Sequence, residues 1–106
     1  MSERRWSLAS ARGFLPEIRR RTEAAVARME KVGLSDGSNT EQQEAAAAAI
    51  LEQWARDMEA LGVEVKGPWL VDFDSGAGYY CWRWPEEELA YFHAYDEGFD
   101  NRTRIQ

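Results

Sequence analysis

In the first third of the chain, a set of mostly apolar residues recurs at alternating spacings of three and four residues. This is the period of one helical face. Ser7 is a suitable N-cap for this face, and Gly33 is a suitable stop. Because proline costs roughly 3 kcal/mol inside a helix, Pro16 predicts a short helix over 8–14 and a longer one over 16–31. The face consists of Leu8, Ala11, Leu15, Ile18, Thr22, Ala25, Met29 and Val32.

A second helical pattern follows a polar loop. Thr40 and Gln43 stand in a capping-box arrangement and Gly62 follows the last apolar residue, so the pattern predicts a helix over 41–61. The alanine run 45–49 has little side-chain bulk, which lets another helix approach closely. We expect the two long helices to form an antiparallel hairpin. The predicted buried stripe is Ala47, Ile50, Leu51, Trp54, Met58 and Leu61.

After residue 62 the period of the pattern changes to two, which is typical of strands. Segments 69–73 and 79–84 are rich in aromatic and β-branched residues and predict two strands. Residues 85–97 allow two readings. Pro85 suits the first turn of a helix, whereas a turn at 85–88 would lead into a third strand over 89–93. A short aromatic strand needs partners on both sides, which favours the strand.

These elements predict an α+β fold in one domain over 1–106. The helical part, 1–62, would hold the short kinked helix and the two long helices as an N-terminal helical hairpin. The aromatic-rich part, 63–106, would form a small antiparallel three-stranded meander. A chain of 106 residues has enough length for one core and too little for two. Ten of its 13 aromatic residues lie between positions 69 and 99, so the sheet should supply the bulky half of that core.

The net charge of −6 is unevenly distributed along the chain. Residues 1–31 hold eight basic and four acidic side chains, whereas residues 32–106 hold five basic and 15 acidic ones. A basic helix lying against an acidic remainder, or against a partner, fits this division. Nucleic acid binding is disfavoured, because three consecutive arginines at 19–21 spread around a helix and the rest of the chain is acidic.

The sequence also predicts the compartment. No apolar run is long enough to span a membrane, and residues 1–6 lack the apolar stretch of a signal peptide. The single cysteine, Cys81, has no partner for an internal disulfide, as is common in a reducing compartment. We therefore expect a cytoplasmic protein that makes no membrane contact.

Five short segments carry a family resemblance. They are Phe14–Pro16, Trp69–Phe73, Cys81–Arg83, Phe92–His93, and Asp96–Phe99 followed by Arg102. In this order and at these distances they resemble a prokaryotic family, domain of unknown function 2203, over nearly the whole chain. The resemblance implies a helical part followed by a strand-rich part, and it favours the third strand at 89–93. The chain departs from the family pattern at Ser10, Phe92 and Asn101, and none of these changes removes a charged or titratable candidate.

One residue of register decides whether the predicted sheet has a polar pocket. A three-residue turn at 85–87 pairs Tyr79 with His93 and Cys81 with Tyr91. Arg83, Tyr91 and His93 then share one face. A two-residue turn instead moves His93 to the face of Trp82, and no pocket forms.

In the first register, His93 is the candidate catalytic residue, with Asp96 or Glu97 orienting its ring. The candidate residues for binding a small anionic ligand are Arg83, Tyr91 and Arg102. The competing interpretation is a structural cluster, in which Arg83 pairs with a carboxylate and His93 bonds to the backbone.

No cofactor is predicted, but a divalent metal remains an alternative. His93 and Asp96, with Glu97, offer one nitrogen and two oxygen ligands, fewer than a typical zinc site holds unless a dimer doubles them.

The leading hypothesis for function is a self-associating binding or interaction module, most simply a homodimer. A two-helix hairpin over three strands has only two thin layers and tends to leave apolar surface uncovered. The alanine run 45–49 and an exposed strand aromatic such as Trp69 would suit an interface between copies. The alternative is a small-molecule or metal-dependent enzyme that uses His93 with Asp96 or Glu97 and Arg83. The sequence leaves open whether the protein is an enzyme.

Overall fold

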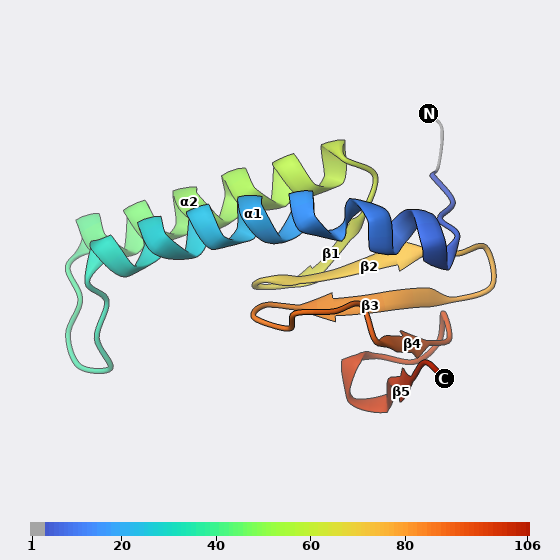
Figure 1. Ribbon diagram of the computed structural model, residues 1–106. Helices are drawn as coiled ribbons and strands as arrows, with labels where there is room; N and C mark the ends of the chain where they lie inside the picture. Colours follow the sequence, from blue (N-terminus) through green and yellow to red (C-terminus); the bar gives the residue numbers. More distant parts are fainter. Residues whose placement is uncertain (1–3) are drawn as a thin grey trace.

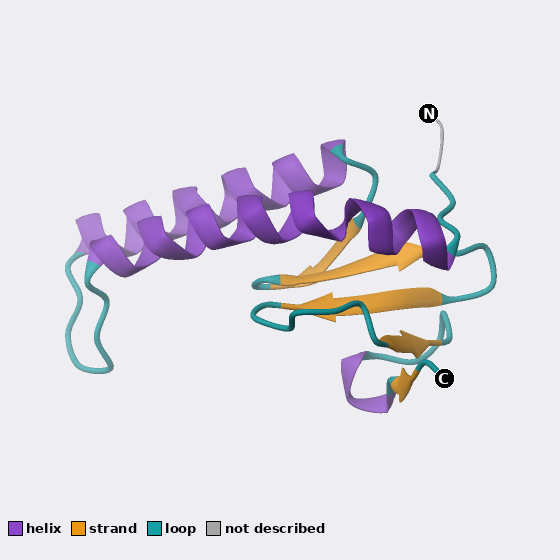
Figure 2. Ribbon diagram, in the orientation of Figure 1, coloured by secondary structure: helices purple, strands orange, loops and turns teal. Residues whose placement is uncertain are grey.

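The computed structural model describes residues 4–106 and has an α+β fold, as predicted. Residues 1–3 lie outside the described residues. They begin the segment 1–6, which was expected to lack the apolar stretch of a signal peptide. Two helices precede a five-stranded antiparallel sheet in the order β1-β2-β3-β4-β5 (Figure 1; Figure 2). The elements are α1 Leu8–Val32, α2 Glu41–Ala60, β1 Glu64–Gly67, β2 Leu70–Asp74, β3 Tyr79–Arg83, β4 Tyr91–His93, the 3-10 helix η1 Phe99–Asn101, and β5 Thr103–Arg104.

The two helices pack side by side and antiparallel (Figure 1). The residues of their predicted faces are buried or half-buried. Ser7 and Ser10 form a capping box at the start of α1, and Thr40 and Gln43 form the predicted one at the start of α2. A buried polar contact joins the helices. The Trp54 indole N–H donates to Thr22 Oγ1 at 2.9 Å, and the Thr22 hydroxyl donates to the Ile18 carbonyl at 2.8 Å.

The predicted break at Pro16 is wrong, because α1 is one continuous helix of 25 residues with Pro16 inside it. Pro16 is exposed, whereas Leu15 and Ile18 beside it are buried in the core. Because proline has no backbone N–H, the Arg12 carbonyl loses its usual hydrogen-bond donor. Arg12 is exposed too. Burial of apolar residues on both sides of the proline thus holds the helix together despite its local cost.

The predicted three-stranded meander is incomplete, because the sheet has five strands. β1 forms from the alternating segment after residue 62 and pairs Val65 with Val71. β5 pairs Arg104 with Tyr91, so β4 has a partner on each side. Residues 91–93 are a strand, as the family resemblance and the partner argument favoured. Trp69, expected as an exposed strand aromatic, lies instead in the turn before β2, with φ 61°. It is half-buried and packs edge-on against Trp54 at a ring separation of 5.0 Å.

The core lies between the helices and one face of the sheet. Its sheet side consists of alternate residues of β2 and β3, because successive side chains of a strand point to opposite faces. The helices supply mostly aliphatic residues, with Trp54 and the partly buried Phe14 as the aromatic ones. Core residues include Trp6, Leu15, Ile18, Trp54, Met58, Val71, Phe73, Trp82 and Leu89. The outer half of the helical hairpin projects beyond the sheet (Figure 1).

In residues 4–106, no helix combines the length and the apolar character needed to cross a bilayer.

Candidate functional site

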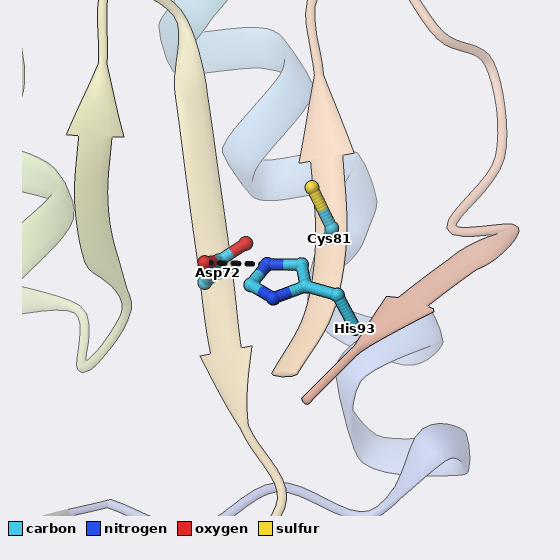
Figure 3. Close-up of side chains that lie close together, drawn as sticks. All are labelled: Asp72, Cys81 and His93. Carbon is cyan, nitrogen blue, oxygen red and sulfur yellow. Dashed lines mark hydrogen bonds and ion pairs between the residues drawn. The ribbon is translucent and has the colours of Figure 1, made fainter. Parts of the chain in front are cut away.

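The face of the sheet opposite the helices carries the polar side chains of β2, β3 and β4. Tyr79 pairs with His93 and Cys81 pairs with Tyr91, so the pairing expected from a three-residue turn is confirmed. The turn itself is wrong, because residues 84–90 form a longer connection between β3 and β4. Asp72 lies directly opposite Cys81 on the neighbouring strand β2. The sheet therefore brings Asp72, Cys81 and His93 together from three adjacent strands (Figure 3). We call these three residues the Asp–Cys–His cluster.

Gly78 allows β4 to approach β3 closely at this point. A side-chain Cβ added at Gly78 would lie 2.8 Å from the carbonyl oxygen of His93 and would also meet the ring of Phe92. Any larger residue would push β4 away. The small residue before β3 therefore helps to set the position of His93.

Both nitrogens of the His93 ring face oxygen atoms. Nε2 lies 3.0 Å from Asp72 Oδ2, and Nδ1 lies 2.9 Å from the Ala94 carbonyl oxygen, with His93 only 4% exposed. A carbonyl oxygen can only accept, so Nδ1 carries a proton. A second proton, or a cation in its place, must then lie between Nε2 and Asp72.

Asp72 is almost fully buried, with 1% of its surface exposed. Burial raises its pKa, and the charge of His93 opposes that rise. The second carboxylate oxygen, Oδ1, has no hydrogen-bond partner within residues 4–106. Buried polar atoms without partners are rare and costly. A cation or a hydrogen-bond donor beside His93 would give this oxygen the partner that it lacks.

The third member of the cluster, Cys81, is completely buried. Burial raises the pKa of its thiol to about 12, and the nearby Asp72 carboxylate adds to the rise. The Arg102 guanidinium acts in the opposite direction and lies 3.9 Å from the sulfur. Nucleophilic cysteines have lowered pKa values. Cys81 is a thiol, not a thiolate, at neutral pH in the absence of another cation.

Metal-free protein should lose stability as pH rises from about 9 to about 12. The folded-state pKa of the Cys81 thiol, about 12, lies above its ordinary value of 9.0, so the unfolded chain releases this proton first. Between these two pKa values, release of the Cys81 proton by the unfolded chain lowers the free energy of unfolding by at most about 1.4 kcal/mol per pH unit. Urea unfolding of wild type and Cys81→Ala with a chelator present measures the effect. The stability of wild type relative to Cys81→Ala should fall as pH rises, and a constant difference contradicts the prediction.

A cavity of about 270 Å³ lies against the Asp–Cys–His cluster. The segment after β4 forms part of its wall, and all three cluster residues line it. Tyr95, at its edge, is 49% exposed, and its hydroxyl donates to Asp74 Oδ1 at 2.6 Å. The remaining lining residues are Lys66, Leu70, Tyr79, Glu97, Gly98 and Phe99.

Neither carboxylate that sequence reasoning placed beside His93 is hydrogen-bonded to its ring. Asp72 takes that place. Asp96 is exposed, and Glu97 Oε1 accepts the Ala94 backbone N–H at 2.9 Å while also lining the cavity. The signal available in the sequence was an acidic residue, Asp72, flanked by the apolar residues Val71 and Phe73 of a predicted strand.

The predicted anion-binding residues lie beside the cavity rather than among the residues that line it. Arg102 pairs with the Glu86 carboxylate, and its guanidinium lies 4.0 Å from the centroids of both the Tyr91 and Phe99 rings. Arg83 is exposed and lies 5.3 Å from the Phe99 ring centroid. The structure thus brings Tyr91 and Arg102 together and holds Arg102 close to Cys81. The cation that lines the cavity is Lys66, which sequence reasoning missed.

The fold and the cluster define the class of protein: an α+β chain with a helical hairpin on one face of a five-stranded antiparallel sheet and a buried Asp–Cys–His cluster on the other. Residues 4–105 match the family described as "Uncharacterized conserved protein (DUF2203)", and the chain belongs to this family. The resemblance stated from its sequence motifs is confirmed. No curated protein and no solved structure matches the chain.

Proposed function

We propose that this protein binds a divalent transition metal of the zinc class through Asp72, Cys81 and His93. One observation carries the proposal: a carboxylate oxygen, a thiol sulfur and an imidazole nitrogen lie within 4.8 Å of one another, all buried. Zinc binds these three atom types at about 2.0–2.3 Å, which separates the ligand atoms of a tetrahedral site by about 3–4 Å. A bound metal would draw the three ligand atoms, now within 4.8 Å of one another, closer together.

The charges of the cluster support a metal over a catalytic thiol. The high pKa of Cys81 makes it a poor nucleophile, whereas a bound cation displaces the thiol proton and relieves the repulsion between thiolate and Asp72. The Ala94 carbonyl holds Nδ1 of His93, as carbonyls commonly do for metal-binding histidines, and leaves Nε2 to face the metal. The unpartnered Oδ1 of Asp72 would gain a partner.

Cobalt(II) substitution tests the proposal directly. Chain purified without an affinity tag and then stripped of metal should bind one cobalt per chain and develop the near-ultraviolet absorption of a cobalt–thiolate bond. Elemental analysis of the unstripped protein should find stoichiometric zinc or a neighbouring transition metal. Cobalt binding without the thiolate band, or no binding at all, contradicts the proposed site.

Self-association is a second candidate function. The outer half of the helical hairpin projects beyond the sheet, and Ala45, Ala46, Ala48 and Ala49 of α2 are exposed there (Figure 1). Leu34 in the adjoining loop is 45% exposed. Small exposed side chains allow a helix of a second copy to pack closely.

Sedimentation velocity at micromolar concentration should give twice the chain mass of 12.2 kDa. Ala48→Arg should shift the protein to the monomer, while Thr103→Arg, an exposed position on β5, serves as the matched control and should leave the dimer intact. A wild-type mass of 12.2 kDa would contradict self-association.

A further inference from the structure

The cavity beside the Asp–Cys–His cluster has the composition of a ligand site. Three protein ligands leave one position of a tetrahedral zinc-class metal unfilled. Asp72, Cys81 and His93 all line the cavity, so the unfilled position faces it. A molecule that enters the cavity would therefore meet the metal directly.

Three aromatic side chains, Tyr79, Tyr95 and Phe99, form part of the cavity wall. The rings of Tyr79 and Tyr95 meet edge-on with their centroids 5.0 Å apart, and Phe99 and Leu70 complete the apolar surface. Aromatic walls favour a flat or compact apolar group. A wholly polar ligand would leave this surface without a partner.

One cation lines the cavity beside the cluster. The Lys66 ammonium nitrogen lies 3.0 Å from Glu64 Oε1 and 4.4 Å from the centroid of the Tyr79 ring. Tyr79 donates its hydroxyl to the same Glu64 oxygen at 3.1 Å. These contacts hold Lys66 at the cavity wall, where it can pair with an oxygen anion bound at the metal.

From these observations we infer that the cavity binds a small carboxylate-class molecule. Its oxygen donors ligate the metal near Lys66, and its apolar body packs against Tyr79, Tyr95 and Phe99. This inference rests on the proposed metal site. A cavity of about 270 Å³ lies just below the range of about 300–1,000 Å³ that is usual for ligand pockets, which limits the ligand to a small molecule.

Two hydroxamates distinguish the metal contact from the contact with the walls. Acetohydroxamate and benzohydroxamate carry the same metal-binding oxygens, but only benzohydroxamate has a ring to place between the aromatic walls. Each is titrated into the cobalt-loaded protein, and binding is followed by the change in the cobalt absorption spectrum. Benzohydroxamate should bind about tenfold more tightly, because burial of its ring removes apolar surface from water.

Two variants locate the aromatic contact. Phe99→Ala should weaken benzohydroxamate binding more than acetohydroxamate binding, so that the tenfold preference falls to about twofold. Tyr95→Ala, at the exposed edge of the cavity, provides the same comparison if Phe99→Ala does not take up cobalt. Leu34→Ala is the matched control, because it removes an exposed apolar side chain outside the cavity and should keep the preference intact.

The possible failures are distinguishable. If wild type takes up no cobalt, the proposed metal site itself is wrong. If it takes up cobalt but neither hydroxamate changes the spectrum, or if the hydroxamates remove the cobalt, the ligand site is wrong and the metal site stands. Equal affinity for the two hydroxamates, or an unchanged preference in both cavity variants, also overturns the ligand site.

Discussion

Replacement of His93 by glutamine should lower the affinity for cobalt(II) by more than 100-fold. Loss of a group that merely orients a metal ligand costs roughly 10–100-fold, and loss of the ligand itself should cost more. Glutamine keeps polar groups near the buried Asp72 carboxylate but has no imidazole nitrogen. Competition with a chromophoric chelator measures the affinity, and urea unfolding checks that the variant is folded.

Asp96→Asn is the matched control for His93→Gln. Asp96 is the carboxylate that sequence reasoning paired with His93, and in the structure it is exposed while Asp72 faces the ring. Asp96→Asn should leave the cobalt affinity within about twofold of wild type, and Asp72→Asn should reduce it as strongly as His93→Gln does. If Asp96→Asn weakened binding and Asp72→Asn did not, the metal ligands would be those expected from the sequence.

Replacement of Trp82 by alanine should lower the free energy of unfolding by about 3–5 kcal/mol. Trp82 is completely buried between the sheet and the helices, and its indole N–H donates to the Glu86 carbonyl at 2.8 Å. Alanine would leave a cavity and remove that hydrogen bond. Domains of this size have a total stability of about 5–15 kcal/mol, so a large fraction would be lost. Urea unfolding followed by far-ultraviolet circular dichroism measures the change.

Two further variants serve as comparisons for Trp82→Ala. Trp82→Phe keeps most of the apolar volume but leaves the Glu86 carbonyl without its donor, so the loss should be about 1–2 kcal/mol. Leu34→Ala, at a site that is 45% exposed, should change stability by less than about 0.5 kcal/mol. A loss below 1 kcal/mol for Trp82→Ala would mean that the layer between helices and sheet contributes little to folding.

The sequence predicted the helices well because their signals are local. The capping pair Thr40 and Gln43 forms as expected, and the apolar spacing of three and four identified the buried faces of both helices. The same local reasoning failed at Pro16. Its cost within the helix is local, whereas the burial of Leu15 and Ile18 that offsets this cost depends on the sheet and on α2.

The sheet was predicted less completely because strands depend on partners distant in sequence. The predicted pairing of β3 with β4 proved correct, and with it the placement of Cys81, Tyr91 and His93 on one face, although residues 84–90 replace the predicted three-residue turn. Strands β1 and β5 were missed. β5 has only two residues, and it is a strand only because Tyr91 and Phe92 of β4 pair with it.

By itself the sequence determined the α+β class and the two helical faces, because these follow from period and capping, and it selected His93 as a candidate from its residue chemistry. Only the tertiary structure decided which groups surround His93. Asp72 is 21 residues away along the chain and reaches the His93 ring through the pairing of β2 with β3 and of β3 with β4. Asp96 is three residues away and exposed. Strand pairing, rather than distance along the chain, selected the carboxylate because the pleat turns Asp72, Cys81 and His93 toward the same side of the sheet.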